Sequence, residues 1–363
     1  MTAPITTPMD APQTLPESLP TNLSVNIPVN PPENPAVNPT VSQPDANTFA
    51  TRRARAVVFA YHNIGVRGLQ VLLARGIEVV LVVTHQDNPQ ESIWFESVAA
   101  LCREHDIPAI TPDSGKDAAL LACLAALKPD FIFSFYYRHM LPLGVLQQAR
   151  FGAFNLHGSL LPKYRGRVPV NWAVLHGESE TGVSLHQMTA RADAGYLVGQ
   201  VAVPILPDDT AYQVFGKLTV AAEQVLWQAV PQLLNGSAPQ LPNDINLGSY
   251  FGGRKPEDGR IDWQQAAQAV YNLHRAVAPP YPGAFTEIHG HTLVLGRARL
   301  LAHPEVRLAS QCQTLAPGLA VVDGMIIGKC GDGGLLHITE LLMDSQIISC
   351  EQLAAILASP APA

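Results

Sequence analysis

Between residues 54 and 205 the sequence alternates short apolar runs with longer amphipathic segments, and this alternation constrains the fold more than any other feature. The short runs indicate buried strands, and the segments between them carry apolar residues at helical spacing. This pattern predicts an α/β domain with a doubly wound, mostly parallel Rossmann-like sheet and right-handed crossovers. The predicted strands are 57–61, 78–84, 108–111, 130–135, one through Asn155, 182–188 and 196–205, and the predicted helices are 65–75, 93–105, 116–127, 143–149 and 210–230.

The composition divides the chain into further segments. Residues 1–53 hold eleven of the 31 prolines and no Lys or Arg before Arg52, which predicts a disordered tail rather than a signal peptide. The α/β domain is expected at 54–248. From 249 to 345 a helix through about Ala278 precedes short β runs and an Asp-Gly turn, which predicts a smaller open β-barrel of the OB-like kind. Residues 346–363 are predicted to be a second tail.

Charge and composition exclude several functions. The net charge of −7 gives no general attraction to nucleic acid. No run approaches the roughly eighteen apolar residues that a membrane span needs, and the five cysteines include no C-x-x-C pair, so a cytoplasmic protein without membrane insertion is predicted. The twelve histidines form neither H-E-x-x-H nor a Cys/His cluster with zinc spacing, which predicts no catalytic metal.

The stretch at 154–167, FNLHGSLLPKYRGR, places an amide and an imidazole on one face of a strand end. Because strand side chains alternate, Asn155 and His157 point the same way. An Asn amide can donate to an oxyanion and a His can move a proton, and acyl transfer to a nitrogen needs both functions. Asp193, in the loop 191–195, could orient the His and stabilise its charged form. The residues alone leave open a hydrogen-bonded turn without chemistry, since Asp also favours turns.

The wider pattern resembles the folate-dependent formyltransferase family. The resemblance is carried by FNLHGSLLPKYRGRVPVNW at 154–172, ETGVSLHQM at 180–188 and RADAG at 191–195. Within that family, VVFAYHNIG, THQDNP and FIFSFYYRHML are most similar to the formyltransferase half of the bifunctional polymyxin-resistance protein. The similarity runs from about Arg55 to about Leu342, and it implies a Rossmann-like catalytic domain followed by an open barrel.

The resemblance also implies a reaction and a set of site residues. The expected reaction transfers formyl from 10-formyltetrahydrofolate to the 4-amino group of UDP-4-amino-4-deoxy-L-arabinose, a step of lipid A modification that confers antibiotic resistance. Asn155, His157 and Asp193 are the expected catalytic residues. The expected folate contacts are His139, Met140, Leu141, Arg167, Thr189, Ala190, Arg191, Ala192 and Asp193.

Several alternatives stay open at this point. The acceptor could be another nucleotide-linked amino sugar, or the tRNA of a methionyl-tRNA formyltransferase, which the negative charge disfavours. Water could replace the amine, which would make the protein a 10-formyltetrahydrofolate hydrolase. A binding protein without catalysis is disfavoured by the intact Asn155, His157 and Asp193. The expected partner is a small nucleotide-sugar substrate, and a homo-oligomer is compatible with the sequence without being predicted by it.

Overall fold

The structure is a computed structural model, and it describes residues 42–45, 47–89, 91, 93–301 and 303–359. Most of the predicted N-terminal tail therefore lies outside the described residues. The last part of that segment packs on the α/β domain, because the Phe49 ring centroid lies 6.1 Å from that of Phe131 and 5.7 Å from that of Phe151. The prediction of a tail up to residue 53 is thus wrong for this stretch, since an aromatic side chain gives it apolar contacts.

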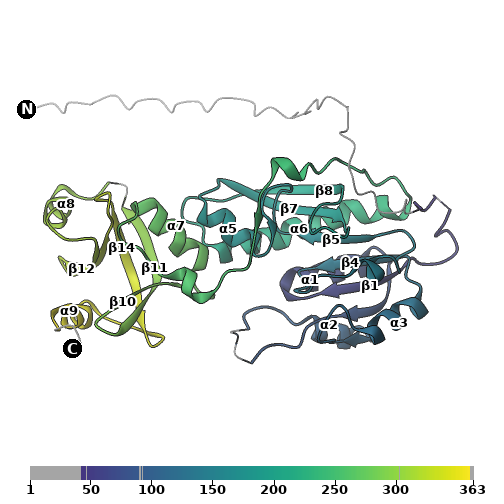
Figure 1. The fold of residues 1–363 in the computed structure, drawn as a ribbon, viewed down its shortest axis with the longest axis horizontal. Coiled ribbons are helices and arrows are strands. Elements are labelled where there is room, and N and C mark those ends of the chain that lie inside the picture. Colours follow the sequence, from purple (N-terminus) through teal and green to yellow (C-terminus); the bar gives the residue numbers. More distant parts are fainter. Residues whose placement is uncertain (1–41, 46, 90, 92, 302, 360–363) are drawn as a thin grey trace, which may run out of the picture. The chain divides into compact units, whose positions relative to one another are not determined.

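A seven-stranded sheet forms the first domain, with strand order β3-β2-β1-β4-β5-β7-β8 (Figure 1). Strands β1 to β5 pair in parallel, whereas β7 and β8 are antiparallel to their neighbours. The predicted mostly parallel, doubly wound sheet is confirmed. The strands are β1 (Arg55–Ala60), β2 (Glu78–Val83), β3 (Ala109–Ile110), β4 (Phe131–Phe135), β5 (Ala153–His157), β7 (Glu180–Gln187) and β8 (Leu197–Pro204).

The helices of this domain follow the predicted order with shifted ends. They are α1 (His62–Ala74), α2 (Val98–Glu104), α3 (Ala118–Leu127), α4 (Leu143–Leu146), α5 (Pro169–Leu175), which the sequence did not predict, and α6 (Ala211–Leu234). Helix α2 begins later than expected because the Ser97 side chain accepts a hydrogen bond from the Ala100 N–H and caps it. Gly68 lies inside α1, where an added Cβ would come within 2.7 Å of the Phe135 ring, so close packing requires this glycine.

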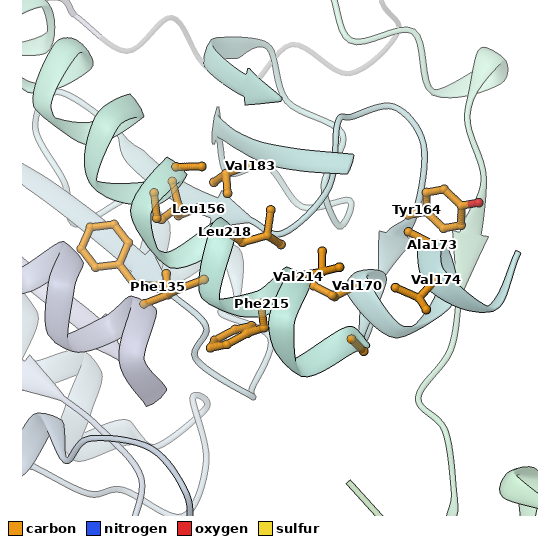
Figure 2. Close-up of a cluster of buried hydrophobic side chains, with 14 of the residues drawn as sticks. Phe135, Leu156, Tyr164, Val170, Ala173, Val174, Val183, Val214, Phe215 and Leu218 are labelled. Carbon is orange, nitrogen blue, oxygen red and sulfur yellow. The ribbon is translucent and has the colours of Figure 1, made fainter. Parts of the chain in front are cut away.

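Helix α6 covers one face of the sheet. Figure 2 shows Val214, Phe215 and Leu218 of α6 in a buried cluster with Leu156 of β5 and Val170 of α5. All five side chains belong to the largest apolar cluster of the described residues, and Leu156 and Val214 are almost completely buried. Burial of this helical stripe, at roughly 25 cal/mol per Å² of apolar surface, holds α6 against the sheet.

The opposite face of the sheet packs against α3 and α4. Leu120 and Leu124 of α3 lie in a second apolar cluster with Val145 of α4 and Ala153 of β5. Since alternate side chains of a strand share a face, residues 155 and 157 lie on the same side of β5 as Ala153. The polar pair is therefore directed away from α6.

The second domain is a curled, antiparallel half-barrel, which confirms the predicted small open barrel. Its strands are β10 (Ala284–Ile288), β11 (His291–Leu301), β12 (Gly318–Val322), β13 (Met325–Lys329), β14 (Leu335–Met343) and β15 (Gln346–Ile347), in the order β10-β11-β14-β13-β12 with β15 beside β14. Asp323 and Gly324, with φ of 49° and 73°, make the predicted hairpin turn between β12 and β13.

Three helices accompany the half-barrel, namely α7 (Ala267–Val277), α8 (Val306–Cys312) and α9 (Cys350–Ala358). The helix predicted through about Ala278 is confirmed as α7, and the segment that precedes it contains the separate short helix η2 (Pro256–Gly259). Helix α9 lies where a second tail was predicted, and that prediction is wrong because Leu353 of α9 is fully buried. No helix in the described ranges combines the length and the apolar character that crossing a membrane requires.

The segment that links the two domains returns to the first domain. It contains the short helix η1 (Ile245–Leu247) and the strand β9 (Tyr250–Phe251), which pairs in parallel with β6 (Arg165–Gly166). The Trp172 indole N–H donates to the Gly252 carbonyl at 3.0 Å, and Asn171 Nδ2 of α5 donates to the Ala276 carbonyl of α7 at 2.8 Å. The linker therefore lies beside the loop that follows β5.

Candidate active site

Strand β5 presents His157 to a loop that folds back on it. The ring is buried, and its Nε2 lies 2.8 Å from the Tyr164 carbonyl oxygen. Because a carbonyl oxygen only accepts hydrogen bonds, Nε2 carries a proton and donates it. The other ring nitrogen, Nδ1, lies 3.6 Å from Oδ1 of Asp193 and forms an ion pair with it when the ring is protonated. The predicted pairing of His157 with Asp193 is thus present in the structure.

The loop that carries Asp193 is placed beside His157 by contacts that the sequence does not reveal. Strand β7 is antiparallel to β5, so the loop after β7 leaves at the start of β5 and must fold back over its face. Asn243 holds the loop there, because its Nδ2 donates to the carbonyl oxygens of Asp193 at 3.0 Å and Gly195 at 2.9 Å. An added Cβ at Gly195 would come within 2.0 Å of the Gln187 carbonyl oxygen, so the return requires glycine.

The Asp193 carboxylate is buried and charged. Burial by itself would raise its pKa, but the charge of His157 and the hydrogen bond from the Gly166 N–H outweigh that effect and hold the pKa well below its usual range. The Gly166 N–H donates to Oδ2 at 2.9 Å, which leaves Oδ1 to face the two histidines. The site thus keeps a fixed negative charge beside His157 across the neutral pH range.

His186 joins Asn155 to this group. Its Nδ1 lies 2.8 Å from the Gln187 carbonyl oxygen, so Nδ1 carries the proton and Nε2 of the neutral ring is an acceptor. That Nε2 lies 3.1 Å from Asn155 Nδ2 and 3.4 Å from Oδ1 of Asp193. The amide therefore donates one of its two N–H groups to His186. Sequence reasoning missed His186, although its place opposite Asn155 on β7 follows from the strand register.

The residues expected to contact folate lie on loops around this group. Met140 is 61% exposed and His139 is exposed, whereas Leu141 is buried in the apolar cluster that also receives Met188. Thr189 follows Met188, and its hydroxyl donates to the Arg191 carbonyl oxygen at 2.9 Å. The loops after β4 and β7 are therefore neighbours. Of the remaining expected contacts, Ala190, Arg191 and Arg167 are exposed and Ala192 is half-buried.

Two tyrosines of the loop after β4 carry buried hydroxyl groups without a polar partner among the described residues. The Tyr137 ring stacks on His85, with centroids 4.2 Å apart and planes at 14°. The Tyr136 hydroxyl lies against Gly158, where an added Cβ would come within 2.2 Å of it. Such groups are donors that a bound molecule could satisfy. In the sequence only the aromatic pair after a buried strand indicated them.

The fold and these contacts define a class of protein, namely a two-domain α/β protein with a His–Asp pair and an amide donor on one face of its sheet. Within the described residues, no group of three or more His, Cys, Asp or Glu side chains could hold a metal ion. The chemistry that the residues themselves offer is proton transfer and stabilisation of an oxyanion.

Comparison with known families specifies this class. A family model described as Formyl transferase matches residues 57–230, and one described as Formyl transferase, C-terminal domain, matches residues 254–357. Together they span more than half of the 363 residues. The chain belongs to the formyl transferase family.

Solved structures share the fold at low sequence identity. An N-formyltransferase from Helicobacter canadensis, in complex with folinic acid and dTDP-3-aminofucose, is 18% identical with a TM-score of 0.61, covering 79% of this chain and 98% of its own. WlaRD, a sugar 3N-formyl transferase in the presence of dTDP and 5-N-formyl-THF, is 18% identical with a TM-score of 0.62, covering 82% and 100%. HypX from Aquifex aeolicus, in complex with tetrahydrofolic acid, is 18% identical with a TM-score of 0.55, covering 83% and 47%.

Proposed function

We propose that the protein transfers a formyl group from 10-formyltetrahydrofolate to the amino group of a nucleotide-linked amino sugar. The observation that carries the proposal is the meeting of His157 and Asp193, 3.6 Å apart, with the Asn155 amide held beside them by His186, in a chain of the formyl transferase family. The ligands named for the two sugar N-formyltransferase structures, a folate and a dTDP compound in each, support both substrate classes.

The surroundings of the site fit a folate. The exposed Met140, the stacked rings of Tyr137 and His85, and the unpartnered Tyr137 hydroxyl offer apolar, aromatic and donor contacts beside one another. We propose that these residues, with Leu141 and the loop 189–192, hold the folate. Bound 10-formyltetrahydrofolate supplies an activated formyl carbon.

The Asn155 amide is the proposed oxyanion donor. One N–H of Nδ2 is engaged by His186, which fixes the plane of the amide and leaves the second N–H for the oxygen that gains charge when the amine attacks. A donor held in advance does not have to reorient during the reaction, which is why such groups lower barriers by several kcal/mol.

His157 is the proposed acid. Its protonated Nδ1 lies 3.6 Å from Oδ1 of Asp193, which is longer than a hydrogen bond. The carboxylate therefore attracts the imidazolium by charge without holding the Nδ1 proton in a hydrogen bond. His157 gives this proton to the departing folate nitrogen as the carbon–nitrogen bond breaks, and regains one from the amine that has formed the new bond. Asp193, fixed in its charged form, keeps the imidazolium aimed.

For the acceptor we propose UDP-4-amino-4-deoxy-L-arabinose. The support is the resemblance of the motifs at 57–65, 84–89 and 131–141 to the arabinose formyltransferase half of the polymyxin-resistance protein. Cytoplasmic lipid A modification is the corresponding role. The proposed catalytic domain is residues 54–248 and the proposed second domain begins at 249, beside the family matches that end at 230 and resume at 254.

One assay tests the reaction and the acceptor together. Purified protein is incubated with 10-formyltetrahydrofolate and UDP-4-amino-4-deoxy-L-arabinose, and products are identified by mass. We expect an N-formylated UDP-sugar that His157→Ala abolishes and that His291→Ala, an exposed histidine of β11, leaves unchanged.

Other products would redirect the proposal. Formylation of dTDP-linked amino sugars alone would change the nucleotide and the sugar while keeping the chemistry. Formate released at the same rate with or without sugar would indicate the hydrolase. Formylation of methionyl-tRNA would move the acceptor to nucleic acid. Full activity of His157→Ala would refute the assigned acid.

A further inference from the structure

Arg165 is a buried arginine whose guanidinium group has no polar partner in the described part of the chain. Its side chain is 7% exposed, and its Nε is enclosed without a hydrogen bond. Among the described residues, no oxygen atom forms a hydrogen bond or an ion pair with this guanidinium. The centroid of the Tyr250 ring lies 5.9 Å from the guanidinium carbon.

Arg275 is also a buried arginine with an unpartnered Nε, but there the fold satisfies both terminal nitrogens. It is 4% exposed, but Nη1 donates to the Asp209 carbonyl oxygen at 3.1 Å and Nη2 to Oδ1 of Asn272 at 2.6 Å. Arg165 lacks both kinds of contact. An enclosed Nε, with terminal nitrogens that have no partner among the described residues, indicates a partner that arrives from outside.

Arg165 lies within the candidate active site. The residue before it, Tyr164, accepts the hydrogen bond from His157 Nε2 through its carbonyl oxygen, and the residue after it, Gly166, donates its N–H to Asp193 Oδ2. The strand β6 that carries Arg165 is fixed by pairing with β9, where the Arg165 N–H donates to the Ser249 carbonyl oxygen at 3.0 Å. The backbone on both sides of Arg165 is therefore bonded to the proposed catalytic groups.

Two more guanidinium groups border the same β6–β9 ribbon. Arg167 lies two residues after Arg165, and its guanidinium lies against Gly253, where an added Cβ would be 3.4 Å from Nη1. Arg254 lies over the Trp172 ring at 4.9 Å and donates to the Asp258 carbonyl oxygen. In the described part of the chain none of these three arginines forms an ion pair with a carboxylate, although the Asp193 carboxylate accepts the Gly166 N–H of the same ribbon.

We propose that the β6–β9 ribbon is the anion subsite of the enzyme, with Arg165 as its buried anchor and Arg167 and Arg254 at its rim. The ligand is an oxyanion group of a substrate, because a guanidinium fork matches phosphate and carboxylate oxygens in pairs. We assign it to the diphosphate of the nucleotide-linked sugar. The exposed ring of Tyr250, at 60% exposure, is available beside it for a nucleotide base.

This inference rests on the proposed function for the identity of the substrates. The glutamate carboxylate of the folate is the second source of the same chemistry, and Arg167 was expected from the resemblance to contact folate. Measuring the binding of a nucleotide and of a folate separately distinguishes the diphosphate from the glutamate carboxylate, and these measurements do not require catalysis.

The experiment compares the full-length protein with Arg165→Met, and with Arg275→Met as the matched control. Affinities for UDP, dTDP and 5-formyltetrahydrofolate are measured by calorimetry, and unfolding midpoints are measured with and without each ligand. Removing an unpaired buried charge should raise the midpoint of ligand-free Arg165→Met by roughly 2–4 °C, whereas Arg275→Met, which loses satisfied hydrogen bonds, should lower it.

The same Arg165→Met variant should bind the nucleoside diphosphate roughly tenfold to a hundredfold more weakly, and its ligand-induced rise in midpoint should shrink. An unchanged nucleotide affinity with a weakened folate affinity would place the folate carboxylate on Arg165 and keep the anion subsite. Wild-type affinities for both ligands in Arg165→Met would overturn the inference.

Two further outcomes keep the test decisive. If Arg165→Met does not fold, Arg165→Lys keeps a charge but loses the fork, and we expect a severalfold loss of affinity for the same ligand; unchanged affinities for all three ligands would overturn the inference. If the wild-type protein binds neither nucleotide nor folate, the proposed function itself fails. If the wild-type protein binds them and Arg165→Met binds them equally well, only the anion subsite fails.

Discussion

Replacing His186 by leucine tests whether this residue acts by holding the Asn155 amide. The side chain is buried, with an exposure of 1%, and leucine fills a comparable volume without either ring nitrogen. The change removes the acceptor that lies 3.1 Å from Asn155 Nδ2 and the donor to the Gln187 carbonyl oxygen. The amide is then free to turn and to present its carbonyl oxygen where its N–H is needed.

The size of the effect follows from one neutral hydrogen bond. Such a bond contributes about 1 kcal/mol, which corresponds to roughly a fivefold change in rate. We therefore expect kcat of His186→Leu to fall roughly fivefold to tenfold, with KM for both substrates near the wild-type values, because the amide is proposed to act on charge that develops only in the transition state. His186→Gln, which keeps an acceptor, should recover part of the rate.

A double-mutant cycle with Asn155→Ala decides the interpretation. If His186 acts through the amide, His186→Leu should slow the Asn155→Ala enzyme less than twofold, with a coupling energy of about 1 kcal/mol. Single-turnover formylation at saturating substrates is the measurement. An equal loss in both backgrounds would refute the reasoning and would assign the effect to Asp193, whose Oδ1 lies 3.4 Å from the same ring nitrogen.

Three other predictions follow from the same structure. Asn155→Ala should reduce kcat roughly a hundredfold or more, since an oxyanion donor is worth about 3 kcal/mol of barrier; near-normal turnover would reject its role. Asp193→Asn should cripple turnover but spare folate affinity, and a wild-type pH–rate profile in this variant would contradict its role. Burial lowers the pKa of His274 to about 4, below its ordinary 6.5, so protonation favours the unfolded chain and stability is lost as pH falls from 6.5 towards 4. In urea unfolding, the free energy of unfolding of the wild-type protein should fall by about 2 kcal/mol between pH 7 and 5 because of His274, and this part of the fall should be absent in His274→Gln. The same pH dependence in both proteins would count against this role of His274.

The sequence predicted most of the first domain because its signals are local. Apolar runs between helical segments identified the strands, and the alternation of side chains along a strand placed Asn155 and His157 on one face. The Asp-Gly pair at 323–324 identified a hairpin for a similar reason, since both positions need positive φ. Errors occurred where a cap or a single contact decided the outcome, as at Ser97 and Phe49.

The contacts of the site were less predictable because they join distant segments. His186 is opposite Asn155 only through the antiparallel register of β7 with β5. The position of Asp193 depends on Asn243, 50 residues further along the chain. The unpaired state of Arg165 depends on β9, which the sequence did not predict as a strand. Each of these requires knowledge of which strands are neighbours.

The sequence by itself therefore determined the kinds of element, the face on which each side chain lies and the chemistry available at 155, 157 and 193. The tertiary structure alone decided that these groups meet, that a second histidine holds the amide, and that Arg165 is buried without a partner. The physical reason is the distance along the chain over which each effect acts. Dihedral preferences and side-chain alternation act over a few residues. Strand order, register and burial are instead set by packing the whole chain around a common core.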